Sequence, residues 1–133
     1  MIKNLINKNL KKIIQYALPL KVGEYVYAID IKKLNKKTPL GQIVSKAPYK
    51  INKIKIEISR DAHYFPAYFV GRFNIFHTEN TLWYNRANAI KACNLLLEDA
   101  EKTQTVQDFF KKIQKLREED LYDRKIQKET SDN

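Results

Sequence analysis

"AYFVGRFNIFHTENTLWYNRANAIKACNLLLEDAE", residues 67–101, contains the change of hydrophobic period on which the fold class depends. Before Asn85 the stretch is rich in aromatic and β-branched residues, which favour strands. After Asn85, apolar residues recur three and four positions apart, as on one face of a helix. Asn85 itself is a suitable N-cap residue. The stretch therefore predicts strands that end near residue 84, followed by a helix over 86–101.

Upstream, alternating apolar and polar residues predict an antiparallel sheet, or a small barrel, of three to five strands within residues 22–84. The clearest signal is INKIKIEIS (51–59), with isoleucines on one face and charged residues on the other. Ile51 is out of phase by one residue, which indicates a β-bulge near Asn52. Further strands are expected at 22–30, within 42–50 where Pro48 would end the strand, and at 81–84, with a loop at 31–41 and a turn at 60–67.

Residues 67–77 are expected to form one strand whose two faces differ in role. The face that packs against the helix of 86–101 holds Phe69, Phe73 and Ile75. The opposite face holds Tyr68, Arg72 and Phe76, and it lies beside the lysine face of 51–59 if the two strands pair.

Helices flank the strands at both ends of the chain. An amphipathic helix is expected over 2–18, ended by Pro19, and a last helix over 105–122 is followed by a charged, frayed tail at 126–133. A helix, a block of strands and then two helices indicate an α+β fold, organised as one domain over 1–125.

Charge is distributed unevenly along the chain. Residues 1–60 contain 14 Lys/Arg and 3 Asp/Glu, whereas residues 61–133 contain 11 and 12, so the net charge of +10 comes entirely from the first part. Such asymmetry is typical of a surface that faces a polyanion. The alternative is a codon bias that favours lysine, asparagine and isoleucine together.

Several classes of protein are excluded or disfavoured by composition. One cysteine cannot form an internal disulfide, no Cys/His set has zinc spacing, and no cofactor is implied. No apolar stretch approaches the roughly 20 residues of a membrane span, and the first residues do not resemble a signal peptide. A cytoplasmic location is therefore expected. Cys93 lies on the apolar stripe of its helix and is expected to be a packed thiol.

The predicted binding surface combines phosphate-contacting cations with stacking side chains, as in proteins that bind single-stranded nucleic acid. The residues expected to contact nucleic acid are Lys32, Lys33, Lys36, Lys37, Lys46, Lys50, Lys53, Lys55, Arg60, Tyr68, Arg72 and Phe76. The lysines at 32–37 would form a basic loop. The lysines at 46–55 and Arg60 would contact phosphates from one edge of the sheet, and Tyr68, Arg72 and Phe76 would stack with bases.

The chain lacks the H-E-x-x-H, G-x-S-x-G and phosphate-loop motifs, and HTE (77–79) is not followed by the P-C-x-x-C of zinc deaminases. A metal-independent ribonuclease needs only general acid–base groups. For that reaction the candidate residues are His63, His77, Arg72 and Tyr64.

Two resemblances follow from these patterns. The segments VGEYVYAID, KINKIKIEI and TLWYNRANAIKACNLLLE are similar to the small SH3-like barrels, capped by a helix, of accessory proteins from phages and mobile elements. That resemblance implies binding to nucleic acid or to a host protein. The order helix, three strands, helix is similar to double-stranded-RNA-binding domains. Their last helix opens with a lysine pair, whereas NRANAIKA offers Arg86 and Lys91, so no residue roles are carried over.

The sequence therefore predicts a small basic module without catalytic activity that binds nucleic acid, RNA in preference, or a ribonucleoprotein. An alternative is an inhibitor, of the phage or mobile-element type, that binds an acidic or nucleic-acid-binding host protein or a nucleoprotein complex. A third hypothesis is the small ribonuclease.

Overall fold

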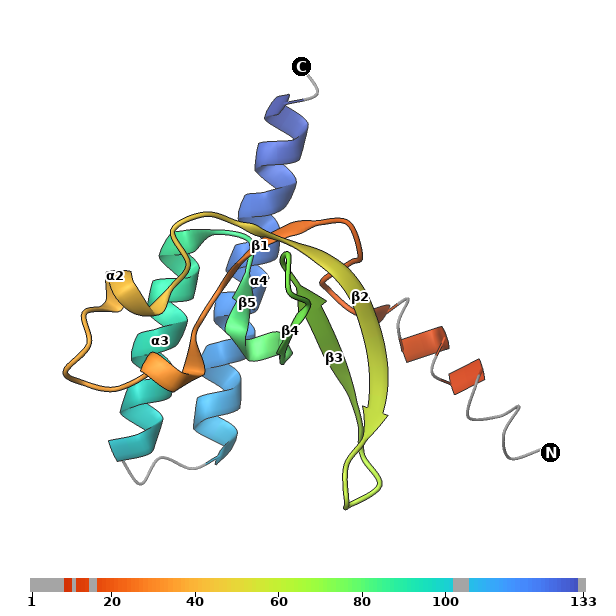
Figure 1. The fold of residues 1–133 in the computed structure, drawn as a ribbon, viewed down its shortest axis with the longest axis horizontal. Helices are drawn as coiled ribbons and strands as arrows, with labels where there is room; N and C mark the ends of the chain where they lie inside the picture. Colours follow the sequence, from red (N-terminus) through yellow and green to blue (C-terminus); the bar gives the residue numbers. More distant parts are fainter. Residues whose placement is uncertain (1–8, 11, 15–16, 102–105, 132–133) are drawn as a thin grey trace. The chain divides into compact units, whose positions relative to one another are not determined.

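The computed structural model describes residues 9–10, 12–14, 17–101 and 106–131 (Figure 1). By its contacts the chain falls into two compact units. Unit 1 consists of Met1–Glu24 and Lys50–Glu79, and unit 2 consists of Tyr25–Tyr49 and Asn80–Asn133. Each unit is described by itself below.

Unit 1 is built on three antiparallel strands, β2 (Tyr49–Ile58), β3 (Tyr64–Val70) and β4 (Ile75–His77). The register of β2 against β3 shifts between Ile51 and Lys53, which confirms the predicted bulge. Beyond the bulge, Ile54 lies opposite Tyr68 and Ile58 opposite Tyr64.

The single strand predicted at 67–77 is wrong, because residues 71–74 form a turn between β3 and β4. Gly71 and Asn74 take positive φ angles of 75° and 49°. This left-handed conformation is accessible to glycine and tolerated by asparagine. The segment is therefore a β-hairpin. The predicted turn at 60–67 is correspondingly shorter, because β3 already begins at Tyr64.

In unit 2, β1 (Tyr25–Ala28) pairs antiparallel with β5 (Leu82–Trp83). The short elements η1 (Ile31–Lys33) and α2 (Leu40–Ile43) follow β1, and η2 (Glu79–Thr81) precedes β5. The strand predicted at 42–50 does not form there, because Leu40–Ile43 is helical and β2 begins only at Tyr49.

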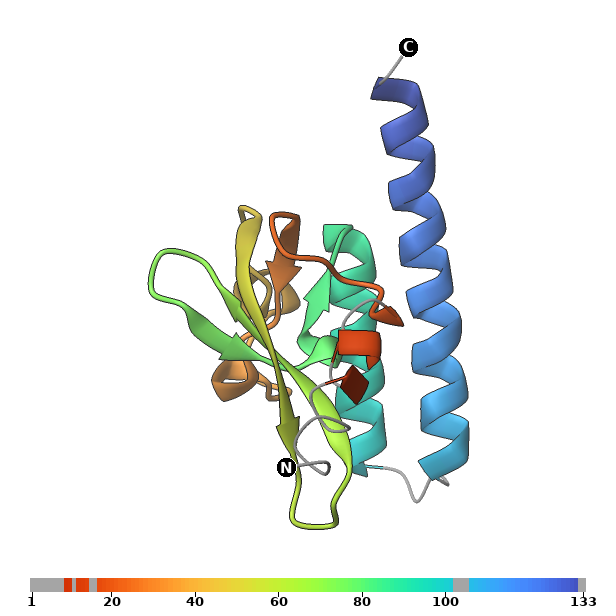
Figure 2. The same ribbon diagram turned by 90° about the vertical axis from the view of Figure 1, so that its right-hand side faces the viewer.

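The helices of unit 2 are α3 (Arg86–Glu101) and α4 (Val106–Ser131), which pack side by side (Figure 2). The bounds of α3 agree with the prediction, and the side chain of Asn85 accepts a hydrogen bond from the N–H of Ala87 at 2.9 Å, as an N-cap should. The expected end of the last helix near residue 122 is wrong. Residues 123–131 have no glycine or proline and are rich in lysine, arginine, glutamine and glutamate, so they continue the helix.

The core of unit 2 is a cluster in which Trp83, Ile29 and Ile43 meet the inner faces of both helices. From α3 it receives Ala89, Ala92 and Cys93, and from α4 Ile113 and Leu116. Apolar residues at the predicted helical spacing thus do face the core. Phe69, Phe73 and Ile75, which were expected against this stripe, belong to unit 1 and are not members of the cluster.

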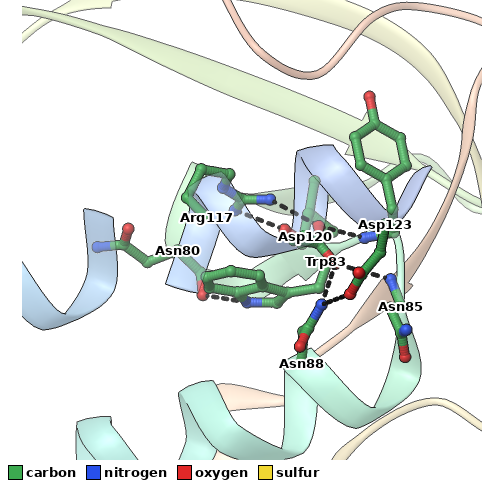
Figure 3. A network of polar contacts seen from close by, with 9 residues as sticks. Asn80, Trp83, Asn85, Asn88, Arg117, Asp120 and Asp123 are labelled. Carbon is green, nitrogen blue, oxygen red and sulfur yellow. Dashed lines mark hydrogen bonds and ion pairs between the residues drawn. The ribbon is translucent and has the colours of Figure 1, made fainter. Parts of the chain in front are cut away.

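A buried polar network ties α4 to the start of α3 (Figure 3). The carboxylate of Asp120, fully buried, accepts hydrogen bonds from the backbone N–H groups of Tyr84 (2.8 Å) and Asn85 (2.9 Å) and from the side chain of Asn88 (2.9 Å). Arg117 forms a 3.4 Å ion pair with Asp120 and donates to the carbonyl oxygen of Leu82 at 2.7 Å. The network fixes the strand-to-helix corner.

Trp83 completes this corner. Its ring lies 3.9 Å from the Arg117 guanidinium, and its indole N–H donates to the carbonyl oxygen of Asn80 at 2.9 Å. A delocalised guanidinium can stack on an indole and satisfy a carboxylate at the same time, which an ammonium group cannot do as well.

The chain is thus α+β with five strands that pair antiparallel and two long helices at its C-terminal end. The ladder of each unit is open, so the barrel alternative is not formed. Of the predicted helix over 2–18, residues 9–10, 12–14 and 17 are helical, Leu18 is not helical, and the other residues lie outside the described ranges. Within the described ranges no helix has the length and apolar character that a membrane span requires.

Candidate nucleic-acid interface

A row of side chains crosses the three strands of unit 1 on one face. Lys53 of β2 lies opposite Phe69 of β3, and Phe69 lies opposite Phe76 of β4. Residues directly opposite each other in antiparallel strands project to the same side. Lys55, two residues after Lys53, projects to that side as well. We call Lys53, Lys55, Phe69 and Phe76 the aromatic-basic face.

The rings and cations of this face are in contact. The rings of Phe69 and Phe76 meet edge to face, with centroids 6.0 Å apart and planes at 70°. The Nζ atom of Lys55 lies 5.8 Å from the centroid of Phe69, which is within cation–π range. Phe76 is half-exposed, at 50% of its full surface. A planar ligand can therefore reach Phe76 while Phe69 supports it from the side.

The two lysines raise the positive potential of the face. The positive charge of the neighbouring Lys55 lowers the pKa of Lys53. Neither ammonium group forms an ion pair among the described residues. Such uncompensated like charges favour an anionic ligand, because it would relieve their repulsion.

The β3–β4 turn carries a second aromatic and cationic pair. The guanidinium of Arg72 lies 5.6 Å from the ring of Phe73, which is 79% exposed. The side-chain amide of Asn52 anchors the turn by donating to the carbonyl oxygen of Gly71 at 2.7 Å and to Asn74 Oδ1 at 2.8 Å. Asn52, which lies at the predicted β-bulge, therefore stabilises the turn through its side chain.

Tyr68 is not available for stacking, contrary to the prediction. It is fully buried, whereas Phe73 and Ile75, predicted to be in the core, are exposed. The prediction was wrong because it assumed that side chains alternate between the two faces of one strand without a break at Gly71. The turn at 71–74 breaks that alternation, and the cross-strand register places Phe69, not Tyr68, beside Lys53.

The predicted cations are divided between the two units. Lys50, Lys53, Lys55, Arg60 and Arg72 belong to unit 1. Of these, Lys50 lies near the turn, since its carbonyl oxygen accepts a hydrogen bond from the N–H of Gly71 at 3.0 Å. Arg60 lies in the β2–β3 turn, at the far end of the strands.

The remaining predicted lysines are on unit 2, and all of them are exposed: Lys32, Lys33, Lys36, Lys37 and Lys46. The loop that carries four of them is ordered by Asn35, whose side-chain oxygen accepts hydrogen bonds from the N–H groups of Lys37 (2.9 Å) and Thr38 (2.8 Å). Such Asx turns hold the backbone and leave the lysine side chains in solvent.

The two histidines do not form one site. His63 lies in the turn before β3, and His77 lies opposite Tyr68 near the other end of that strand. His63 and Tyr68 are five residues apart in extended chain, so the two histidines are separated by about 17 Å along the strand at the usual rise per residue. Tyr64 lies at the His63 end of the strand and Arg72 in the turn beyond its other end, so the four candidate catalytic residues are not gathered together.

Two other candidate functional residues, Cys93 and Arg86, have structural roles. Cys93 is buried in the core of unit 2, as predicted, and burial raises its pKa to about 11. Arg86, the first residue of α3, donates to the carbonyl oxygens of Ser45 (3.2 Å) and Gly41 (3.0 Å). Within the described residues, no group of three or more His, Cys, Asp or Glu side chains could hold a metal ion.

Sequence reasoning missed two members of the site, Phe69 and Phe73. A signal for Phe73 was present, because Gly71 and Asn74 are turn-forming residues on either side of Arg72-Phe73. Phe69 could not be assigned without the strand register. Comparisons with protein-family models, with curated proteins and with solved structures found no match.

Proposed function

We propose that the chain is a small nucleic-acid-binding module whose aromatic-basic face receives a single strand, with RNA preferred. The observation that carries the proposal is the cross-strand row in which Lys53, Phe69 and Phe76 lie side by side on three strands. Rings that stack with bases and cations that track the phosphates are the combination used by single-strand-binding proteins.

The chemistry assigns different tasks to the two residue types. Phe76, supported edge-on by Phe69, would stack with one base, and the exposed Phe73 would take a second. Each stacked base contributes about 1–3 kcal/mol. Lys53, Lys55 and Arg72 would neutralise phosphates along the same path. Paired bases in a duplex are already stacked, and unpaired bases occur most often in RNA loops and ends, which is the reason to favour single-stranded RNA.

The salt dependence of binding follows from the number of cations. If Lys50, Lys53, Lys55 and Arg72 each neutralise one phosphate of a single strand, the slope of log K against log salt is about −3. The lysines of unit 2 would make the slope steeper if they contact the same strand. A ribonucleoprotein offers the same phosphates and unpaired bases, so it falls within the proposal.

The test is fluorescence anisotropy of the full chain against labelled single-stranded RNA, duplex RNA and duplex DNA, over about 50–300 mM salt. Wild type should prefer the single strand. Lys53→Glu with Lys55→Glu should weaken binding at least about tenfold and flatten the slope by about 1.4. Lys125→Glu with Lys128→Glu is the matched control, because it changes net charge equally at exposed positions of α4.

Two results would contradict the proposal. One is weak binding of all three probes at low salt, and the other is an equal effect of the two double substitutions. Weak binding would favour the alternative, an inhibitor of the phage or mobile-element type that binds a host protein or nucleoprotein complex. The observation behind that alternative is the exposed apolar group of Phe73, Ile75 and Phe76, since aromatic residues often dominate the binding energy of protein interfaces.

A further inference from the structure

A groove of about 330 Å³ runs between α3 and α4 in unit 2. It is far richer in lysine than its surroundings. Residues 80–133 contain ten Lys/Arg and ten Asp/Glu, so this part of the chain has no net charge. The groove is nevertheless lined by three lysines and one acid, with the following residues: Lys91, Asn94, Leu95, Lys112, Lys115, Leu116 and Glu119.

The three lysines are free to bind an external anion. All three are exposed, and none forms an ion pair among the described residues. Lys112 and Lys115 are three residues apart on α4, a spacing at which like charges repel. In contrast, two arginines of this unit are engaged, since Arg117 pairs with Asp120 and Arg124 lies over the ring of Tyr84.

The groove between these cations is apolar. Leu116 is buried and Leu95 is half-buried, and both line the groove together with Lys91 of α3 and the two lysines of α4. None of the residues that line the groove is aromatic, so bases would have nothing to stack on. The lining therefore suits aliphatic side chains flanked by carboxylates better than it suits nucleic acid.

We propose that the α3–α4 groove binds an acidic amphipathic helix of a protein partner. Leucine-type side chains of the partner would lie on Leu95 and Leu116, and its flanking glutamates or aspartates would pair with Lys91, Lys112 and Lys115. Docking of an amphipathic helix between two helices is a common mode of peptide recognition. The inference does not depend on RNA binding by the aromatic-basic face, which lies in the other unit.

The probe is a fluorescein-labelled helical peptide of about 15 residues, with leucines along one face and glutamates elsewhere. A scrambled peptide of the same composition has the same charge without the apolar face. Anisotropy with the full-length wild type should show saturable binding, about tenfold tighter for the amphipathic peptide than for the scrambled one. Lys112→Glu with Lys115→Glu should weaken binding at least about tenfold, and Leu95→Ala about fivefold.

Lys111→Glu with Lys125→Glu is the matched control, because both lysines are exposed on α4 and neither lines the groove. Circular dichroism of each variant confirms that the helices are retained. The proposal is overturned if wild type does not bind the amphipathic peptide, if the scrambled peptide binds equally, or if both double substitutions have the same effect. Displacement of the peptide by single-stranded RNA, in the Lys53→Glu with Lys55→Glu variant, would also overturn it by assigning the groove to nucleic acid.

Discussion

Replacement of Asp120 by alanine should destabilise unit 2 strongly, because this buried carboxylate joins α4 to the start of α3. The side chain accepts four hydrogen bonds: two from backbone N–H groups at the start of α3, one from Asn88 and one from Arg117. Alanine removes all four acceptor contacts at once. It also removes the carboxylate that forms an ion pair with the guanidinium of Arg117, whose side chain is only 8% exposed.

The magnitude follows from the buried ion pair. Removing one partner of such a pair typically costs about 3–5 kcal/mol, because an uncompensated charge stays buried. The unpaired N–H groups of Tyr84 and Asn85 act in the same direction. Arg117 keeps its hydrogen bond to the Leu82 carbonyl oxygen and its place over Trp83, which limits the loss. We expect Asp120→Ala to lower the free energy of unfolding by about 4 kcal/mol.

Urea unfolding followed by tryptophan fluorescence measures this loss directly, because Trp83 is the only tryptophan and lies against Arg117. Asp123→Ala is the control, since Asp123 makes a single 3.3 Å contact with Asn88, which also donates to Asp120. That change should cost less than about 1 kcal/mol. Arg117→Met combined with Asp120→Leu should recover only the part of the loss that comes from the buried charge, because leucine leaves the N–H groups of Tyr84 and Asn85 unpaired. A loss for Asp120→Ala no larger than that for Asp123→Ala would refute the reasoning.

Three further predictions concern the hairpin, the stacking face and the thiol. Asn52→Ala removes both hydrogen bonds from the Asn52 side chain to the β3–β4 turn, so hydrogen exchange of the backbone amides of residues 71–74 should become faster. Unchanged exchange rates would show that the turn does not need these two hydrogen bonds. Phe76→Ala should weaken single-stranded RNA binding by about 1–3 kcal/mol with the salt slope unchanged, whereas a changed slope would mean that stacking is not its role. Because burial raises the pKa of Cys93 in the folded chain, the thiol of the unfolded chain ionises first, and the free energy of unfolding should fall as pH rises from about 9 to about 11. Urea unfolding of Cys93→Ala should depend less on pH over this range. An equal pH dependence in wild type and variant would contradict a raised pKa.

Local patterns were sufficient for the elements whose stability depends on near neighbours. The bounds of α3, the Asn85 cap and the core position of Cys93 follow from helical periodicity and capping chemistry, which act within a few residues. The bulge after Ile51 follows from a one-residue break in alternation. The shared face of Lys53 and Lys55 follows from the same alternation.

The composition of the candidate site depended on the turn between two strands. Side chains of a strand alternate with period two, so a prediction that continues the strand through residues 71–74 assigns Tyr68 to the exposed face and Phe73 to the core. In the structure Tyr68 is buried and Phe73 is exposed. Local residues were informative here, since Gly71 and Asn74 favour a turn, but the same residues also fitted an uninterrupted strand. Only the strand register, which places Phe69 opposite Lys53 and Phe76, shows that Phe69 belongs to the aromatic-basic face.

By itself the sequence determined the α+β class, the main helix of the core, the bulge and the lysine face of one strand, because each depends on interactions between residues close in the chain. Tertiary structure alone decided the partners of that face, the division of the predicted cations between two units and the buried contact of Asp120 with Tyr84 and Asn85, some 35 residues away. Strand register and buried polar pairs join distant segments, and no local period encodes which segments meet.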